Sequence, residues 1–278
     1  MNPKKRLKFG LALGGGAALG FAHIGVIKAL EENDISVDCI SGTSFGAMIA
    51  TLYAFGASLG DLEREAESLK TQKLIRAKLS ISGVASNALI AKIIKKYAGQ
   101  TEIEKADIPL SIIATNIENG EKVILQKGNV AKAVLASSCI PGLFSPVEID
   151  GQMMVDGGIT ENVPLSPLKN LGAEIIIGVN LLKHRNYKKP KNIVDVLVNS
   201  FDMVNHRPSA QPSKEDSNFL IEPNLRDFYM GDFKKWKEIS EIGYRETLKF
   251  IPEIKKYHEQ PIRRPVWKKI NKIIKKIL

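Results

Sequence analysis

Cysteine is scarce in this chain. Only Cys39 and Cys139 occur among 278 residues, with no Cys-x-x-Cys pair and no clustered histidines beside them. This pattern argues against a disulfide framework and against a structural zinc site. We therefore expect a reducing, cytoplasmic setting and neither a metal nor another cofactor.

Long apolar runs are missing as well. No stretch approaches the roughly 20 residues that a membrane-spanning helix needs, although 44% of the residues are hydrophobic. Residues 1–8 are basic and residues 9–22 are largely apolar, which imitates a secretory signal, but five glycines interrupt the apolar part. We expect a globular chain without a cleaved signal, long enough to bury a core without disulfides.

Acidic residues are absent after Glu259. Seven of the ten net positive charges follow it, which leaves only three for the rest of the chain. These cations are Arg263, Arg264, Lys268, Lys269, Lys272, Lys275 and Lys276. Isoleucines recur between them at helical spacing and Trp267 stands near the start, which predicts a basic amphipathic helix on a membrane surface. The alternatives are a helix docked on the protein body and non-specific attraction to nucleic acid, for which no recognised motif is present.

The first half of the chain repeats one pattern twice. Residues 7–13 read as a buried strand, followed by three glycines and an apolar helix to about Leu30. Residues 35–40 read as a second strand, followed by a glycine-containing turn and a helix over 47–55. Two successive strand–turn–helix units predict an α/β fold with a mainly parallel central sheet flanked by helices.

Later segments add strands and helices to this scheme. We expect strands over about 108–117, 173–181 and 218–222 and hairpins at Asn119-Gly120 and Asp150-Gly151. We expect helices over 129–138, 193–206 and 232–257, the last broken near Pro252. The stretch from 58 to 100 is helical and polar, with a break near 80–83.

The second turn has the form Gly-x-Ser-x-Gly. Ser44 stands between a strand and a helix, where a sharp bend needs small neighbours, and Gly42 and Gly46 supply that room. The N-terminus of the following helix can stabilise an anion that forms beside the serine. The spacing favours a nucleophile, while a glycine-rich turn with a helix-capping serine is the alternative.

The first turn is a run of three glycines. Gly14, Gly15 and Gly16 leave their backbone N–H groups uncovered, and such a loop can cradle an oxyanion or a phosphate. A dinucleotide-binding loop is the competing interpretation, with Asp38 as the ribose ligand, but Leu19 occupies the position of the last required glycine. The third interpretation is a tight turn with a purely structural role.

A carboxylate follows the second hairpin. Asp156 comes directly after an expected strand and precedes Gly157 and Gly158, a position that holds it firmly and leaves it accessible. It can accept a proton from a hydroxyl within hydrogen-bond reach. An ordinary Asp-Gly turn explains the same residues.

Taken together, these units resemble the patatin-like phospholipase family. The resemblance includes the glycine loop over 13–20, HIGV at 23–26, GTSFG at 42–46, ASSCIPGLFSPV at 136–147 and VDGG at 155–158. The pieces stand in the family's order and cover about residues 7–181. The resemblance implies a three-layer patatin-like fold, with a patatin-like catalytic domain over 1–260 and the basic tail over 261–278.

The resemblance also implies a reaction and its residues. Ser44 is expected to be the nucleophile and Asp156 its base in a dyad without histidine, and Gly14, Gly15 and Gly16 to lie in the oxyanion loop. The substrate is then an acyl ester of a lipid, cleaved through an acyl-enzyme by a cytoplasmic enzyme on the inner face of a membrane, with no nucleic-acid partner. Arg or Lys is usual in the family where this chain has Leu19, so the oxyanion hole lacks a cation that would increase its efficiency.

Three further groups of residues leave alternatives. A Ser–His–Asp triad would use His184, His206 or His258, whereas His23 suits an orienting role on the first helix. Ser137, Ser138 and Cys139 either line the pocket or simply end a helix. Finally, Leu19 is compatible with a non-catalytic lipid-binding protein of the same fold.

Overall fold

The computed structural model describes residues 6–71, 88–184, 186, 187, 189–206, 212 and 216–257. The described strands form one eight-stranded sheet with the order β5-β6-β3-β2-β1-β7-β8, and β4 pairs with β3 beside this path. The strands are β1 (Phe9–Leu13), β2 (Cys39–Thr43), β3 (Leu110–Asn116), β4 (Lys122–Leu125), β5 (Val147–Ile149), β6 (Gln152–Asp156), β7 (Ile175–Val179) and β8 (Phe219–Ile221).

The sheet is mixed. Strands β3, β2, β1, β7 and β8 are parallel neighbours, while β4 and β6 pair with β3 in the antiparallel sense and β5 pairs with β6 likewise. The parallel part confirms the α/β class. The two expected hairpins account for the antiparallel pairs β3–β4 and β5–β6, since Gly120, Asp150 and Gly151 have the positive φ angles of tight hairpin turns.

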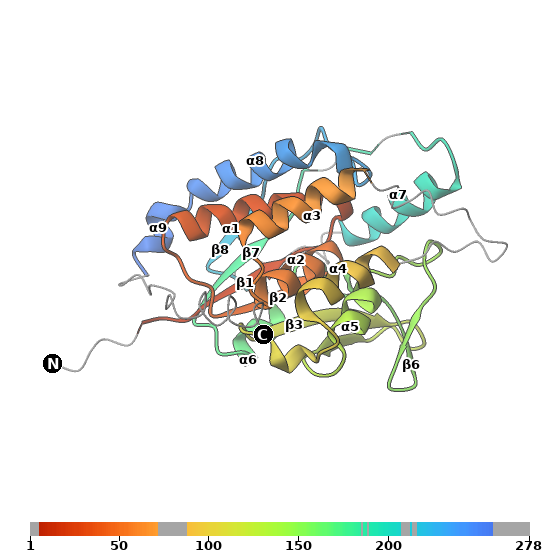
Figure 1. Cartoon of the computed structure of the whole chain (residues 1–278). Coiled ribbons are helices and arrows are strands. Elements are labelled where there is room, and N and C mark those ends of the chain that lie inside the picture. Colours follow the sequence, from red (N-terminus) through yellow and green to blue (C-terminus); the bar gives the residue numbers. More distant parts are fainter. Residues whose placement is uncertain are drawn as a thin grey trace.

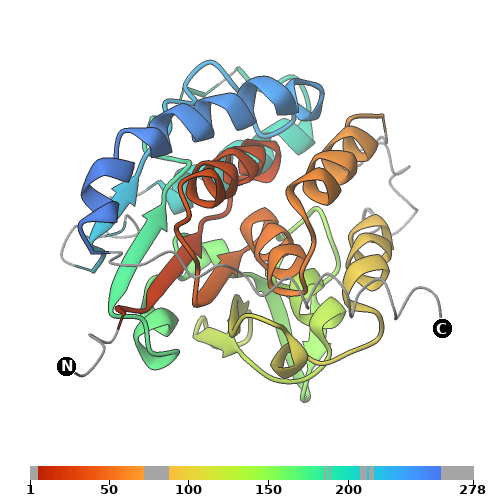
Figure 2. The same ribbon diagram turned by 60° about the vertical axis from the view of Figure 1, so that its left-hand side comes forward.

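Helices cover both faces of the sheet (Figures 1 and 2). The longer ones are α1 (Ala22–Glu32), α2 (Phe45–Ala54), α3 (Leu59–Thr71), α4 (Ala88–Ala98), α5 (Val130–Ser137), α7 (Ile193–Asn205) and α8 (Trp236–Leu248). Short ones are α6 (Ser166–Asn170), α9 (Ile251–Lys255) and the 3₁₀ turns η1 (Ala17–Phe21), η2 (Ile103–Lys105), η3 (Gly157–Ile159) and η5 (Phe233–Lys235).

The core follows the alternation of side chains along β1. Leu11 and Leu13 belong to the large core that also contains residues of α1, α2 and α8. Ala12 points to the opposite face, where a smaller core contains Leu168 of α6. Figure 1 shows α1 and α8 on one side of the strands and α6 on the other, so the arrangement has three layers.

One expectation was wrong and one helix was missed. The second strand is Cys39–Thr43 rather than 35–40, because pairing with β1 begins only at Cys39 and includes Gly42. Ile35 is buried all the same, which explains why the pattern continued into the loop before the strand. Helix α6 was not foreseen, because five residues are too few to show a helical period.

Candidate active site

Ser44 occupies a sharp bend between β2 and α2. Its backbone has φ 55° and ψ −124°, an unusual conformation for a residue with a side chain. Such a conformation costs about 1–3 kcal/mol and is typical of functional turns. Its N–H donates to the hydroxyl of Ser137 at 2.9 Å, and the residue is 8% exposed. The predicted elbow is therefore present, and its serine is largely buried.

The elbow fits tightly against the glycine loop. A Cβ on Gly46 would lie 2.2 Å from the carbonyl oxygen of Leu13, so only glycine allows the first turn of α2 to approach this closely. A Cβ on Gly15 would lie 3.2 Å from the Cβ of Ser44. The loop that follows β1 thus lies directly beside the serine.

Strand register brings Asp156 to the same place. Thr43 pairs with Ile113, and the next residue of β3, Ala114, pairs with Asp156. Ser44 and Asp156 consequently flank β3 from either side, about two strand spacings of about 4.8 Å apart along the backbone. The chain after Asp156 then folds over β3, where a Cβ on Gly157 would lie 2.2 Å from the carbonyl oxygen of Ile113.

The carboxyl group of Asp156 is completely buried, whereas the sequence suggested an accessible position. Its Oδ1 accepts the Gly158 N–H at 2.8 Å, while Oδ2 has no hydrogen-bond partner within the described part of the chain. Burial raises the pKa of Asp156 to about 7, and the nearby Ser44 hydroxyl and the Gly158 N–H lower it in part. The carboxyl is thus half-ionised near neutral pH, where a general base is most effective.

The contact between Ser44 and Asp156 is loose. The serine hydroxyl is near enough to lower the pKa of Asp156, yet Oδ2 finds no partner among the described residues within the usual geometric limits of a hydrogen bond. Catalytic hydrogen bonds are often long or poorly aligned before a substrate binds.

The three loop glycines differ in what their amides do. The N–H groups of Gly14 and Gly15 donate to the carbonyl oxygens of Val179 and Asn162, each at 3.2 Å. The amides of Gly16 and Ala17 have no hydrogen-bond acceptor among the described residues. Gly14 and Gly15 therefore hold the loop in place, and the available donors lie at its second half.

His23 holds the glycine loop through a hydrogen bond to its backbone. The imidazole is buried, and its Nε2 lies 2.7 Å from the carbonyl oxygen of Gly14. Burial lowers the pKa of His23 to about 4, and the hydrogen bond to Gly14 opposes this only in part. The ring is thus neutral at pH 7 and donates its Nε2–H to the loop, in keeping with the orienting role expected for it.

Asn162 was missed by the sequence analysis. Its side chain donates to the carbonyl oxygen of Gly15 at 3.5 Å, and its own carbonyl accepts the Gly15 N–H. The one available signal was an amide residue two positions before a proline, shortly after the Asp-Gly-Gly turn. Asn162 links the glycine loop to the segment that carries Asp156.

Residues 137–139 brace both halves of the site. The Ser137 hydroxyl accepts from the Ser44 N–H, and the carbonyl of Cys139 accepts from the Asp156 N–H at 2.9 Å. The thiol of Cys139 donates to the Ser145 carbonyl at 2.9 Å, and burial, with the nearby Asp156, raises its pKa to about 12. Cys139 is therefore no nucleophile, and the segment ties Ser44 to Asp156 through the backbone.

The other ionisable candidates lie apart from this pair. The Nε2 of His206 lies 3.4 Å from the carbonyl of Lys183. No described histidine makes a hydrogen bond with Ser44 or Asp156; His258 lies outside the described residues.

Asp38 and Leu19, the two other residues considered for the first turn, have structural positions. Asp38, the proposed ribose ligand, accepts the Phe9 N–H at 2.7 Å and pairs with Arg6, which gives it a structural role. The side chain of Leu19 is completely buried in the large core, so it brings no charge to the glycine loop.

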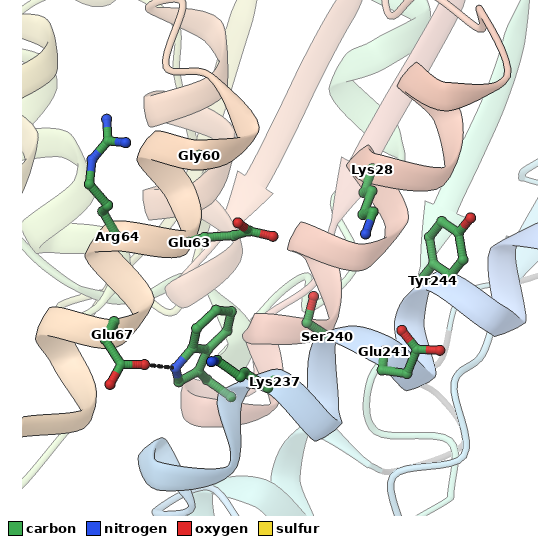
Figure 3. A pocket seen from close by; sticks show the side chains of 10 residues that line it. Lys28, Gly60, Glu63, Arg64, Glu67, Lys237, Ser240, Glu241 and Tyr244 are labelled. Carbon is green, nitrogen blue, oxygen red and sulfur yellow. Dashed lines mark hydrogen bonds between the residues drawn. The ribbon is translucent and has the colours of Figure 1, made fainter.

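A separate groove of about 650 Å³ lies between α1, α3 and α8 (Figure 3). It is lined by Lys28, Gly60, Glu63, Arg64, Glu67, Trp236, Lys237, Ser240, Glu241 and Tyr244. The indole of Trp236 donates to Glu67 at 2.7 Å, and Glu67 also pairs with Lys70. Because Ser44 and Asp156 are not among its lining residues, the groove is distinct from the candidate active site.

The basic tail over 261–278, with Trp267 and Lys268, Lys269, Lys272, Lys275 and Lys276, lies outside the described residues. Among the helices that are described, none combines the length and apolar character that crossing a bilayer requires.

Comparison with known proteins gives consistent results. Residues 11–169 match the model of the family described as patatin-like phospholipase. An uncharacterized NTE family protein of Mycobacterium tuberculosis is 36% identical over 174 residues, which is 62% of this chain and 48% of that protein. A lysophospholipase of Yarrowia lipolytica is 27% identical over 277 residues, or 88% of this chain and 19% of that protein. The chain thus spans about half or less of these relatives.

The fold has a counterpart among solved structures. VipD from Legionella pneumophila matches with a TM-score of 0.55 at 15% sequence identity, over 89% of this chain and 67% of that one. At this identity the match speaks for the fold alone. The family match extends over more than half of the chain and includes the serine elbow, the glycine loop and Asp156. The chain therefore belongs to the patatin-like phospholipase family.

Proposed function

We propose that this protein is a lipid acyl hydrolase in which Ser44 and Asp156 form a catalytic dyad. The observation that carries the proposal is a strained serine elbow beside a fully buried carboxyl group whose pKa is raised to about 7. Family membership and the lysophospholipase among the relatives favour an acyl ester of a lipid as the substrate.

The first step forms an acyl-enzyme. Asp156 accepts the hydroxyl proton of Ser44 on Oδ2, and the serine oxygen attacks the acyl carbonyl carbon. The carbonyl oxygen becomes an oxyanion, which the N–H groups of Gly16 and Ala17 stabilise together with the N-terminus of α2. Asp156 returns the proton to the alcohol or lysolipid as its ester bond to the acyl group breaks.

The second step releases the acyl group. Asp156 accepts a proton from water, whose oxygen attacks the acyl-serine, and the same amides hold the second oxyanion. The fatty acid leaves, and Ser44 regains its proton. Gly14, Gly15, His23 and Asn162 act by positioning in both steps, because their hydrogen bonds fix the loop that supplies the donors.

The basic tail is assigned to the membrane in this proposal. Its lysines and Trp267 suit an anionic surface, where each lysine contributes about 1 kcal/mol. Removal of residues 262–278 should weaken association with vesicles and leave the hydrolysis of a soluble ester intact. Unchanged association with vesicles would mean that the tail does not bind the membrane and has a structural role instead.

Hydrolysis of acyl esters tests the dyad. Short-chain nitrophenyl esters and lysophospholipid should both be cleaved by the wild-type protein, while Ser44→Ala and Asp156→Asn should each lower kcat by at least about 10³-fold. Ser166→Ala is the matched control and should retain full activity, because this exposed hydroxyl at the start of α6 bonds with Glu161 and Lys122 and not with Asp156. Activity that survives in Ser44→Ala would refute the proposal.

Two alternatives give different results in the same assay. A histidine-dependent triad requires that His184→Ala or His206→Ala abolish hydrolysis, whereas the dyad predicts wild-type rates for both. A non-catalytic protein of this fold would bind lipid vesicles without releasing fatty acid from any of these esters.

A further inference from the structure

Helix α7 has an inverted distribution of polarity. Its buried residues are Asp202 and Asn205, each 1% exposed, whereas Ile193, Val196 and Met203 are 65%, 42% and 48% exposed. A helix on the surface of a globular protein ordinarily turns its apolar side chains inward. The outward apolar side chains of α7 therefore need an explanation outside the core.

The three exposed apolar residues lie on one face. Positions 193, 196, 200 and 203 follow helical spacing, and Ser200 is the one polar member of the row. We call Ile193, Val196 and Met203 the outer stripe of α7. Exposed apolar side chains gathered on one face of a helix are typical of sites of protein or membrane contact.

Contacts on the inner side fix the direction of the stripe. The amide nitrogen of Asn205 would lie 2.8 Å from a Cβ placed on Gly158, in the turn that follows Asp156. At the middle of α7, Leu197 Cδ1 would lie 3.3 Å from a Cβ on Gly142. The helix thus packs along the Asp156 side of the candidate active site. Figure 1 shows it at the periphery of the molecule.

The segment before α7 adds an aromatic side chain and positive charge. Tyr187 is 36% exposed, and Lys189 and Lys191 are exposed and form no ion pair with the described residues. The next acid along the chain, Asp195, accepts the Lys191 N–H at 2.8 Å and is half-buried. Apolar side chains bordered by an aromatic residue and lysines are the composition of helices that lie in the membrane interface.

We propose that the outer stripe of α7, with Tyr187, Lys189 and Lys191, docks on the surface of an anionic lipid bilayer. A second copy of this chain is the competing occupant. Twofold pairing through the stripe brings a second set of the same lysines to the interface, which is less favourable than contact with lipid phosphates.

Docking in this orientation has a consequence for substrate entry. Because the inner side of α7 packs against the turn that follows Asp156, a bilayer on its outer stripe would lie one helix away from that turn. Docking would therefore bring lipid esters close to the candidate active site. This consequence rests on the proposed hydrolase function, whereas the docking surface itself does not.

Vesicle binding in the Ser44→Ala background tests the surface without consuming the lipid. Co-sedimentation of the full chain with phosphatidylserine-containing phosphatidylcholine vesicles should weaken about tenfold or more when Ile193→Ser, Val196→Ser and Met203→Ser are combined. Lys189→Gln and Lys191→Gln should each weaken binding about fivefold at low salt, and the loss should shrink on pure phosphatidylcholine.

A matched triple variant provides the control. Ile117→Ser, Ile124→Ser and Leu248→Ser remove exposed apolar side chains elsewhere on the surface, at 49%, 38% and 37% exposure, and should leave vesicle binding unchanged. Equal binding by the two triple variants, both confirmed as folded by thermal unfolding, would overturn the proposal. So would light scattering that shows a dimer which only the outer-stripe variant dissociates.

Hydrolysis separates this proposal from the proposed function. With Ser44 intact, the outer-stripe variant should keep its kcat on a soluble ester and show a raised apparent KM on vesicle substrate. Vesicle binding without any ester hydrolysis would refute the proposed function and leave the docking surface standing.

Discussion

Asp156→Asn should make the protein inactive and, at alkaline pH, more stable. The carboxyl of Asp156 is completely buried, and burial raises its pKa from 3.8 to about 7. A pKa difference of one unit between the folded and the unfolded state corresponds to about 1.36 kcal/mol. The buried carboxylate therefore costs the folded state about 4 kcal/mol at pH 8. Asparagine keeps the oxygen that accepts the Gly158 N–H and carries no charge.

The sign of the pH dependence follows from the direction of the shift. The folded protein holds the Asp156 proton more tightly than the unfolded chain, so the cost is absent below about pH 4 and fully present above about pH 7. His23 acts in the opposite direction. Its pKa falls from 6.5 to about 4, so its contribution is present above pH 6.5 and lost as the pH falls to about 4. In the wild-type protein the two effects oppose each other over this range.

Urea denaturation at pH values from 4 to 9 measures these contributions. The gap in unfolding free energy between Asp156→Asn and the wild-type protein should open from near zero at pH 4 to about 4 kcal/mol at pH 8. Asp150→Asn, at the exposed tip of the same hairpin, is the control and should show no such gap. A gap that is the same at pH 4 and pH 8 would refute the reasoning, because Asp156 would then not be desolvated.

Three further predictions concern the elbow and the loop. The free energy of unfolding in urea should be about 1 kcal/mol higher for Ser44→Gly than for Ser44→Ala, because glycine adopts a φ of 55° without strain. Equal free energies of unfolding would mean that the elbow is unstrained. Gly46→Ala should lower the Tm by many degrees because its Cβ would lie 2.2 Å from a backbone carbonyl, whereas Gly60→Ala, with nothing nearer than 3.6 Å, should be neutral or stabilising. His23→Ala should lower kcat about tenfold or more at unchanged KM, with partial rescue in His23→Gln, whose amide can still donate to Gly14; a change in KM alone would contradict the positioning role.

The sequence was sufficient for most of the fold. Hairpin turns are local signals, so Asn119-Gly120 and Asp150-Gly151 were found where expected. The helix expected over 129–138 also begins there, where the Asn129 side chain accepts the Lys132 N–H. The start of β2 was misplaced because burial, unlike strand pairing, continues back to Ile35. Pairing depends on β1, which is distant in sequence, and no local pattern reports it.

The candidate site divides in the same way. Ser44, Asp156 and the three glycines were recognisable as motifs, because each needs special residues within a short stretch. The contacts of Asn162 with Gly15 and of Ser137 with Ser44 join segments more than 90 residues apart, and ordinary polar residues in a loop or at a helix end give no sign of them. The N–H groups of Gly14 and Gly15 likewise find their hydrogen-bond acceptors in β7 and in the loop before α6, which are distant in sequence.

A fluorophosphonate probe tests the central claim most directly. It reacts with a serine only when a base and oxyanion donors activate the hydroxyl, so peptide mapping after labelling at pH 8 should place a single adduct on Ser44. Labelling should disappear in Ser44→Ala and drop strongly in Asp156→Asn. An unlabelled wild-type protein, or an adduct on another serine, would contradict the account.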